Sequence, residues 1–155
     1  MSDFPNIETL LPHEAPMTLI DKMLAVEELS VHCQVTITTK SPFFDENEQG
    51  VGGWVGLEYM AQTIAAWSGY HNIQKGKASQ IGFLLGNRRY DSQLPIFPIG
   101  MTLDIFATLL LENDGMAAFA CEIQSDDKVL ASSQLNVFLP AKEQVEAMLK
   151  GKKDE

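Results

Sequence analysis

The chain has 155 residues, 45% of them hydrophobic, which fits a single globular domain with one core. Its formal net charge of −10 argues against nucleic-acid binding, which needs a basic surface. The acidic first residues carry no long apolar stretch, so we expect no secretory signal, no membrane span and a cytoplasmic protein.

The first third of the chain predicts a short helix near residues 7–11 and two strands over residues 17–29 and 31–39. The second strand alternates, with Val31, Cys33, Val35 and Ile37 on one face and His32, Gln34, Thr36 and Thr38 on the other. Residues 41–53, which are rich in acidic and glycine residues, are expected to form a loop.

A long helix is predicted to follow that loop and to end near residues 71–76. Glu58 is the only formally charged residue between Glu48 and Lys75, so the helix is expected to be enclosed by the rest of the fold. A carboxyl group buried there needs hydrogen-bond donors or must keep its proton. Such a group suits a general acid or base, although a purely structural role would also explain it.

Steps of about 100° along the helix put Trp54, Gln62, Ala65 and Ala66 on the same stripe as Glu58. Gly50, Gly52 and Gly53 precede the helix, where free N–H groups favour an oxygen atom with partial negative charge. A tight turn into the helix is the alternative explanation of these glycines.

The rest of the chain predicts strands over residues 81–90, 101–112, 116–125 and 129–139, with hairpin turns at residues 113–115 and 126–127. A polar helix over residues 142–150 and a charged tail complete the chain. One long helix among antiparallel strands is an α+β plan, in which a curved sheet wraps the helix. The sheet leaves an edge strand, which dimerisation commonly covers.

Cys33 and Cys121 lie far apart in segments of strand-like alternation, and we expect both to be reduced core residues. His13, His32 and His71 are scattered along the chain without metal-type spacing. The sequence therefore predicts no metal site and no cofactor.

Three segments, in order, resemble hot-dog-fold 3-hydroxyacyl-[acyl-carrier-protein] dehydratases. LLPHEAPMTLIDKM (residues 10–23) resembles the first motif of that family, and GWVGLEYMAQ (residues 53–62) resembles its central-helix motif. IGFLLGNRRYDSQLPIFPIGMTL (residues 81–103) resembles its FLG…PVxPGDxL segment, and ASSQLNVFLP (residues 131–140) its last core strand. The resemblance implies a dimeric hot-dog domain over residues 1–140, with a C-terminal polar helix and tail over residues 141–155.

The resemblance also implies a mechanism. In these dehydratases, a histidine of one subunit removes the α-proton of a 3-hydroxyacyl thioester. The helix acid of the other subunit protonates the departing hydroxyl, and a backbone N–H at the helix start polarises the thioester carbonyl. Carried over to this sequence, the acid is Glu58 and the amide is that of Gly53. Asn47, Trp54 and Gln62 are further candidates for substrate binding.

The family's histidine does not carry over. It follows a Phe-Phe or similar pair in a (G)HFPG motif, whereas this chain continues from Phe43-Phe44 with Asp45-Glu46-Asn47. Counting forward from the Phe pair reaches Asn47, and counting back from Glu58 reaches Phe44, because the loop is shorter than in the family. Neither an amide nor a phenyl ring can accept a proton at neutral pH.

Three explanations follow from this departure. His13 could serve as the base, although it could equally hold the turn in which it lies. Glu58 could act alone and activate water, as the helix acid does in hot-dog thioesterases. The chain could also bind acyl groups or pair with a catalytic homologue that contributes the histidine. Its short loop resembles that of dehydratase-like proteins of bacterial aryl-polyene and related polyketide or fatty-acid clusters, where two such subunits work together.

The expected partners follow from the same resemblance. Arg88, Arg89, Lys75 and Lys77 are the candidate docking charges for an acidic acyl carrier protein, although two solvated basic turns would look the same. The chain is expected to form a homodimer or higher oligomer, or a heteromer with a second dehydratase-like subunit.

Overall fold

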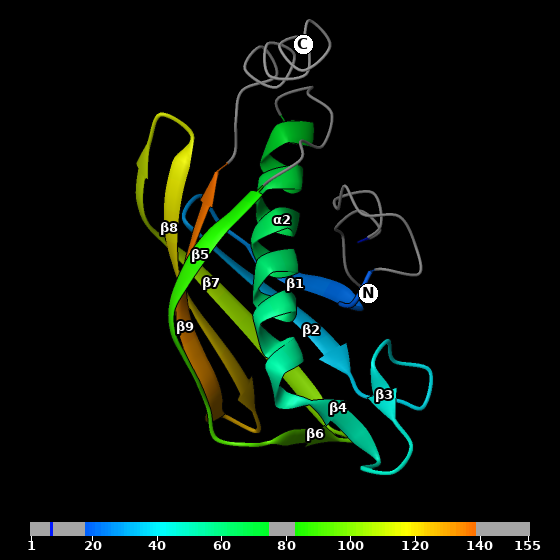
Figure 1. The fold of residues 1–155 in the computed structure, drawn as a ribbon. Helices are drawn as coiled ribbons and strands as arrows, with labels where there is room; N and C mark the ends of the chain where they lie inside the picture. Colours follow the sequence, from blue (N-terminus) through cyan, green and yellow to red (C-terminus); the bar gives the residue numbers. More distant parts are fainter. Residues whose placement is uncertain (1–6, 8–17, 75–82, 139–155) are drawn as a thin grey trace, which may run out of the picture.

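The protein was analysed as a computed structural model, which describes residue 7 and residues 18–74 and 83–138. One long helix packs across one face of a strongly twisted antiparallel sheet, and a small second sheet lies near the start of the helix (Figure 1). The predicted α+β plan is therefore confirmed. The predicted helices near residues 7–11 and 142–150 lie largely or wholly outside the described residues.

The large sheet has six strands in the order β1-β2-β7-β8-β9-β5. Its strands are β1 (Lys22–Val26), β2 (Ser30–Thr36), β7 (Thr102–Asn113), β8 (Met116–Ser125), β9 (Lys128–Phe138) and β5 (Phe83–Ser92). The small sheet consists of β3 (Phe44–Asp45), β4 (Gly50–Gly52) and β6 (Ile96–Pro98). A single 3₁₀ turn, η1 (Gly53–Val55), leads into the central helix α2 (Gly56–Gln74).

The two predicted hairpin turns are confirmed. Asp114 and Gly115 have φ values of 52° and 84°, and Asp126 and Asp127 have φ values of 50° and 64°. Two consecutive residues with positive φ are typical of the type I′ turn, whose twist matches that of the flanking strands. These turns join β7 to β8 and β8 to β9, and so they fix the registers at the centre of the sheet.

The core lies between α2 and the large sheet. The alternation predicted for β2 is confirmed, because Val31, Cys33 and Val35 are buried whereas their neighbours are only half-buried. Burial also raises the pKa of the Cys33 and Cys121 thiols to about 12, as expected for reduced core cysteines. None of the helices in the described part of the chain is long and apolar enough to cross a membrane.

Two features of the fold differ from the sequence-based expectation. Residues 41–53, predicted to be a loop, supply β3 and β4 of the small sheet, and the unpredicted β6 completes it. In addition, the sheet does not enclose α2 on every side. Leu57, Ala61 and Ala65 are only half-buried and Glu58 is exposed, so the described residues leave one stripe of the helix partly uncovered.

Candidate active site at the start of the central helix

The start of the central helix is held by the chain segment that joins β5 to β6. The Gly53 N–H donates to the carbonyl oxygen of Pro95 at 2.8 Å, and the Tyr90 hydroxyl donates to the carbonyl oxygen of Gly53 at 2.5 Å. A side chain on Gly53 would crowd the Leu94 carbonyl and lie 3.2 Å from the Ser92 hydroxyl. Glycine is therefore required here by close backbone approach, in addition to its role in the turn.

Glu58 lies on the uncovered stripe of α2, and the expectation that the single chain buries it is wrong. Its predicted neighbour Trp54, four residues earlier, is 64% exposed. The Trp54 ring meets the ring of Phe43, itself 49% exposed, edge to face at a centroid distance of 5.4 Å. The acid thus stands on an aromatic and apolar surface that no described part of this chain covers.

Gln62, which was expected on the same stripe, turns into the protein. It is 3% exposed, and its Oε1 accepts the backbone N–H of Leu19 at 2.8 Å. Its contact with the chain before β1 accounts for its burial. Asn47 is exposed in the β3–β4 connection, where its backbone N–H donates to Asp45 Oδ1 at 2.8 Å. Substrate binding by Asn47, Trp54 or Gln62 stays a prediction.

The Gly53 amide was expected to polarise a thioester carbonyl. In this structure that N–H already donates to Pro95, so it is not a free donor. The next amide, of Trp54, belongs to the first turn, whose leading N–H groups have no acceptor within the helix itself. A carbonyl bound at the helix start would therefore have to use this amide or displace the Pro95 contact.

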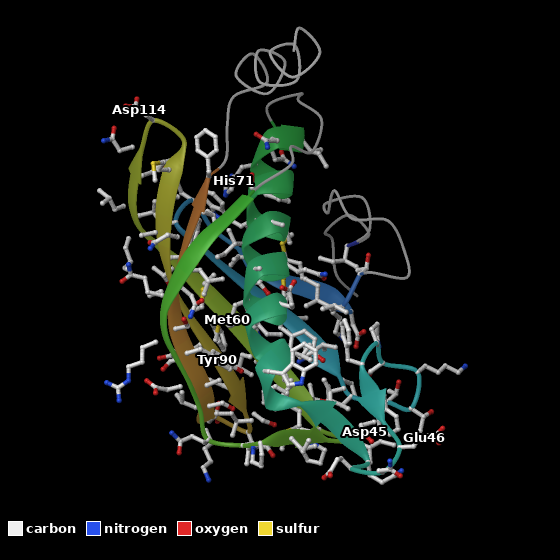
Figure 2. The ribbon with its side chains drawn as sticks, viewed as in Figure 1. Asp45, Glu46, Met60, His71, Tyr90 and Asp114 are labelled. Carbon is white, nitrogen blue, oxygen red and sulfur yellow. The ribbon has the colours of Figure 1, made fainter. Side chains whose placement is uncertain are left out.

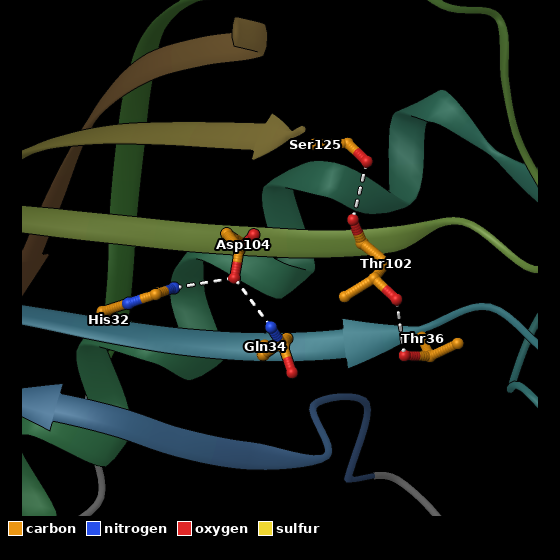
Figure 3. A network of polar contacts seen from close by, with 6 residues as sticks. All are labelled: His32, Gln34, Thr36, Thr102, Asp104 and Ser125. Carbon is orange, nitrogen blue, oxygen red and sulfur yellow. Dashed lines mark hydrogen bonds and ion pairs between the residues drawn. The ribbon is translucent and has the colours of Figure 1, made fainter. Parts of the chain in front are cut away.

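The two described histidines both lie away from Glu58. His32 is on the face of the sheet opposite α2, where its Nε2 is 2.8 Å from Asp104 Oδ1 (Figure 3). Its ring stacks on that of Phe106. His71 lies near the other end of α2, with Nε2 2.9 Å from the carbonyl oxygen of Glu27 (Figure 2). It lies thirteen positions after Glu58, which is about 20 Å along the helix axis.

His13 lies outside the described residues, so its part as a base stays a prediction. Within the described ranges, no three potential ligand side chains cluster as a metal ion would require.

The candidate docking charges are only partly described. Arg89 is exposed on β5, where its Nε lies 3.2 Å from Asp91 Oδ2. Both side chains of this ion pair are exposed, so it contributes little to stability and leaves the guanidinium accessible. The side chain of Arg88 is not among those described, and Lys75 and Lys77 lie outside the described residues. Docking by these four residues stays a prediction.

Sequence reasoning missed Tyr90, whose side chain reaches the helix start from β5 (Figure 2). Its direction depends on a local irregularity. Arg88 pairs with Gln134 and Asp91 pairs with Ser132, so β5 has one more residue than β9 between these two pairs. Arg89, within this irregularity, has a positive φ of 42°. One extra residue in a strand re-aims the side chains beside it. Strand alternation alone carries no signal for such a bulge.

A long helix laid across a curved antiparallel sheet, as in the described part of this chain, is the arrangement of a hot-dog-fold protein. The chain belongs to the ApeP-like family, because the family model described as ApeP dehydratase matches residues 5–150. The resemblance inferred from the sequence is thereby confirmed, and with it the assignment to the dehydratase group of lyases.

Individual relatives agree with this family. The 3-hydroxyacyl-[acyl-carrier-protein] dehydratase FabZ of Chlamydia trachomatis serovar L2 is 30% identical over 146 residues, covering 90% of this chain and 94% of the relative. The FabZ of Pseudoalteromonas translucida is 26% identical over 137 residues, covering 86% of this chain and 90% of the relative.

Solved structures give the same result. A chain of the dehydratase heterocomplex ApeI:P from Xenorhabdus doucetiae is 36% identical, with a TM-score of 0.86, covering 94% of this chain and 98% of that chain. A hypothetical thioesterase with coenzyme A from Streptococcus pneumoniae TIGR4 has a TM-score of 0.61 at 8% identity, covering 77% of this chain and 85% of that chain. At that identity the likeness concerns the fold alone.

Proposed function

We propose that this chain is the acid-bearing subunit of a 3-hydroxyacyl thioester dehydratase and that a different, histidine-bearing subunit supplies the base. The observation that carries the proposal is the surroundings of Glu58. The carboxyl group stands on an open apolar stripe of α2, and neither described histidine lies beside it. A surface of this kind, with a charge at its centre, is better suited to a second protein than to water.

The reaction needs two groups on opposite sides of the substrate. The base removes the proton from the α-carbon, a double bond forms between the α- and β-carbons, and the β-hydroxyl leaves. A protonated Glu58 gives its proton to that hydroxyl, so the products are an enoyl thioester and water. A partner subunit packed over Trp54 and Glu58 would exclude water from the reacting groups.

A second copy of the same chain would bring Phe44 and Asn47 again to the positions where the family has its histidine. Neither side chain accepts a proton at neutral pH. The solved relative from Xenorhabdus doucetiae is itself part of a dehydratase heterocomplex. Both observations favour a heteromer over a homodimer as the active form.

The substrate carrier that fits this proposal is an acyl carrier protein, because the names of the FabZ relatives specify an acyl-carrier-protein substrate. The proposed place of the reaction is the cytoplasm. Such carriers are acidic, and this chain is acidic as well, so productive encounter needs a local basic surface. Arg88 and Arg89 on β5, with Lys75 and Lys77 after α2, are the residues proposed for it.

The direct test is enoyl formation from a 3-hydroxyacyl carrier-protein thioester, by the chain alone and after assembly with a loop-histidine homologue from the same organism. We expect the chain alone to be inert and the assembled form to be active. Glu58→Gln in this chain should lower the activity of the assembled form at least about 100-fold, the usual contribution of a general acid. Equal activity of the wild type and the Glu58→Gln variant would contradict the proposal.

The same samples distinguish dehydration from thioester hydrolysis. If Glu58 instead activates water, free thiol is released by the chain alone and enoyl product does not form. If the assembled form releases thiol but yields no enoyl product, the dehydratase proposal is wrong and the thioesterase alternative takes its place.

Carrier docking predicts a charge effect. Arg88→Glu plus Arg89→Glu should weaken carrier-protein binding at low salt by about tenfold or more, since each reversal replaces attraction by repulsion. Lys40→Glu plus Lys128→Glu changes the net charge equally at exposed positions elsewhere in the chain and is the matched control. Equal affinities of the two double variants, measured by titration at low and high salt, would refute docking at Arg88 and Arg89.

A further inference from the structure

Tyr90 links the edge strand of the large sheet to the start of the catalytic helix. It belongs to β5, the last strand in the sheet order, and its hydroxyl donates to the carbonyl oxygen of Gly53 at 2.5 Å. The hydroxyl also lies so close to Gly56 that a Cβ there would overlap it. The first helical residue thus has to be glycine for the tyrosine to reach its acceptor.

The contact holds one defined peptide group. Because a peptide unit is planar and trans, fixing the Gly53 carbonyl also fixes the N–H of Trp54, which points in the opposite direction. The peptide unit on the other side of Gly53 is held as well, because the Gly53 N–H donates to Pro95. Both peptide groups at the start of the helix are therefore attached to β5 and the segment that follows it.

The protonation state of the phenol suits this role. Burial raises the pKa of Tyr90 above its ordinary value, opposed in part by a hydrogen bond from the Ser92 side chain. The phenol therefore keeps its proton at neutral pH and remains a donor to the Gly53 carbonyl. A phenylalanine of the same shape would fill the space without making that hydrogen bond.

Glu58 lies five residues after Gly53, about 7.5 Å along the helix axis. Glu58 is the third residue of the 19-residue helix α2, so the position of the first turn sets the position of the carboxyl group. We propose that Tyr90 is a positioning residue for the dehydration. Its hydrogen bond fixes the Gly53–Trp54 peptide group and thereby orients the Glu58 carboxyl group towards the substrate. The inference rests on the proposed function of Glu58.

The test compares Tyr90→Phe with Tyr70→Phe in the full chain assembled with its histidine-bearing partner. Tyr70→Phe also removes a phenol hydroxyl from the protein, but at the opposite end of α2. For Tyr90→Phe we expect kcat to fall about tenfold with KM unchanged, because small displacements of a catalytic group cost rate more than binding. Tyr70→Phe should retain the wild-type kcat.

Amide hydrogen exchange gives a second measurement that does not depend on activity. In Tyr90→Phe the amides of residues 55–58 should exchange at least about tenfold faster than in the wild type, while those in the second half of α2 should not change. Wild-type exchange at residues 55–58, or a wild-type kcat in Tyr90→Phe, would overturn the inference.

A uniform rise in exchange along the whole helix, with a matching fall in Tm, would also overturn it, because it indicates a merely structural role. An inactive wild-type assembly would instead overturn the proposed function. The exchange rates would then still decide whether Tyr90 holds the helix start.

Discussion

At the scale of single residues, Glu58 illustrates what a sequence can and cannot predict. Helical geometry correctly put the acid on one stripe with Trp54, because residues four apart share a face. The apolar neighbours of Glu58 wrongly predicted its burial, and they did not indicate that Gln62, four residues further on, is the buried side chain. Apolar neighbours indicate that a surface is covered, but they do not tell whether the covering comes from the same chain or from another protein.

The buried thiols lead to a prediction about pH. Burial raises the pKa of Cys33 from 9.0 to about 12, so the folded protein holds this proton more tightly than the unfolded chain does. The resulting stabilisation is complete below about pH 9 and is lost as the pH rises towards 12. The free energy of unfolding should therefore fall above pH 9, by up to roughly 4 kcal/mol for one thiol.

Urea denaturation between pH 8 and pH 11 measures this effect. Cys33→Ala lowers stability at every pH, but it should flatten the fall above pH 9 relative to the wild type, because one shifted group is gone. Cys121→Ala should do the same, since its thiol is equally shifted by burial. Parallel pH profiles in the wild type and both variants would show that the thiols do not carry the effect.

At the scale of elements, the strands of the large sheet were predictable because their signals are local. The alternation in β2 and the positive-φ hairpin turns after β7 and β8 depend on residues next to one another in sequence. The small sheet was not predictable, because β6 (Ile96–Pro98) meets β4 (Gly50–Gly52) from more than forty positions away. Short strands that pair over such a separation leave no periodic pattern.

The fit of Tyr90 against the helix start predicts that Gly56 cannot be replaced. A methyl group at Gly56 would overlap the Tyr90 hydroxyl and lie 3.0 Å from Ile123 Cδ1. Gly56→Ala should therefore destabilise the protein by about 1–3 kcal/mol, in spite of the better helix propensity of alanine. Thermal or urea denaturation measures the change.

Gly86→Ala is the matched control, because a methyl group on Gly86 in β5 meets no other atom within 4 Å. Its free energy of unfolding should stay within about 0.5 kcal/mol of the wild type, as for most surface substitutions. If Gly56→Ala were as stable as Gly86→Ala, the close packing of Tyr90 on the helix would be wrong.

At the scale of the whole molecule, two surfaces of the single chain are incomplete. The sheet ends at β5, whose outer edge pairs with no other described strand, and α2 leaves the stripe around Glu58 uncovered. An exposed Trp54 and an open strand edge are common features of protein interfaces. The sequence predicted an assembly from the edge strand and the missing histidine, but it could not identify which surface the partner covers.

The most direct test of whether a partner subunit completes the site at Glu58 is the crystal structure of the chain assembled with its dehydratase-like partner. We expect a histidine of the partner subunit to face the Glu58 carboxyl group across a substrate-sized gap, with the partner packed over Trp54 and Phe43. An assembly in which Glu58 stays in contact with solvent, or faces only residues of its own chain, would contradict the central claim.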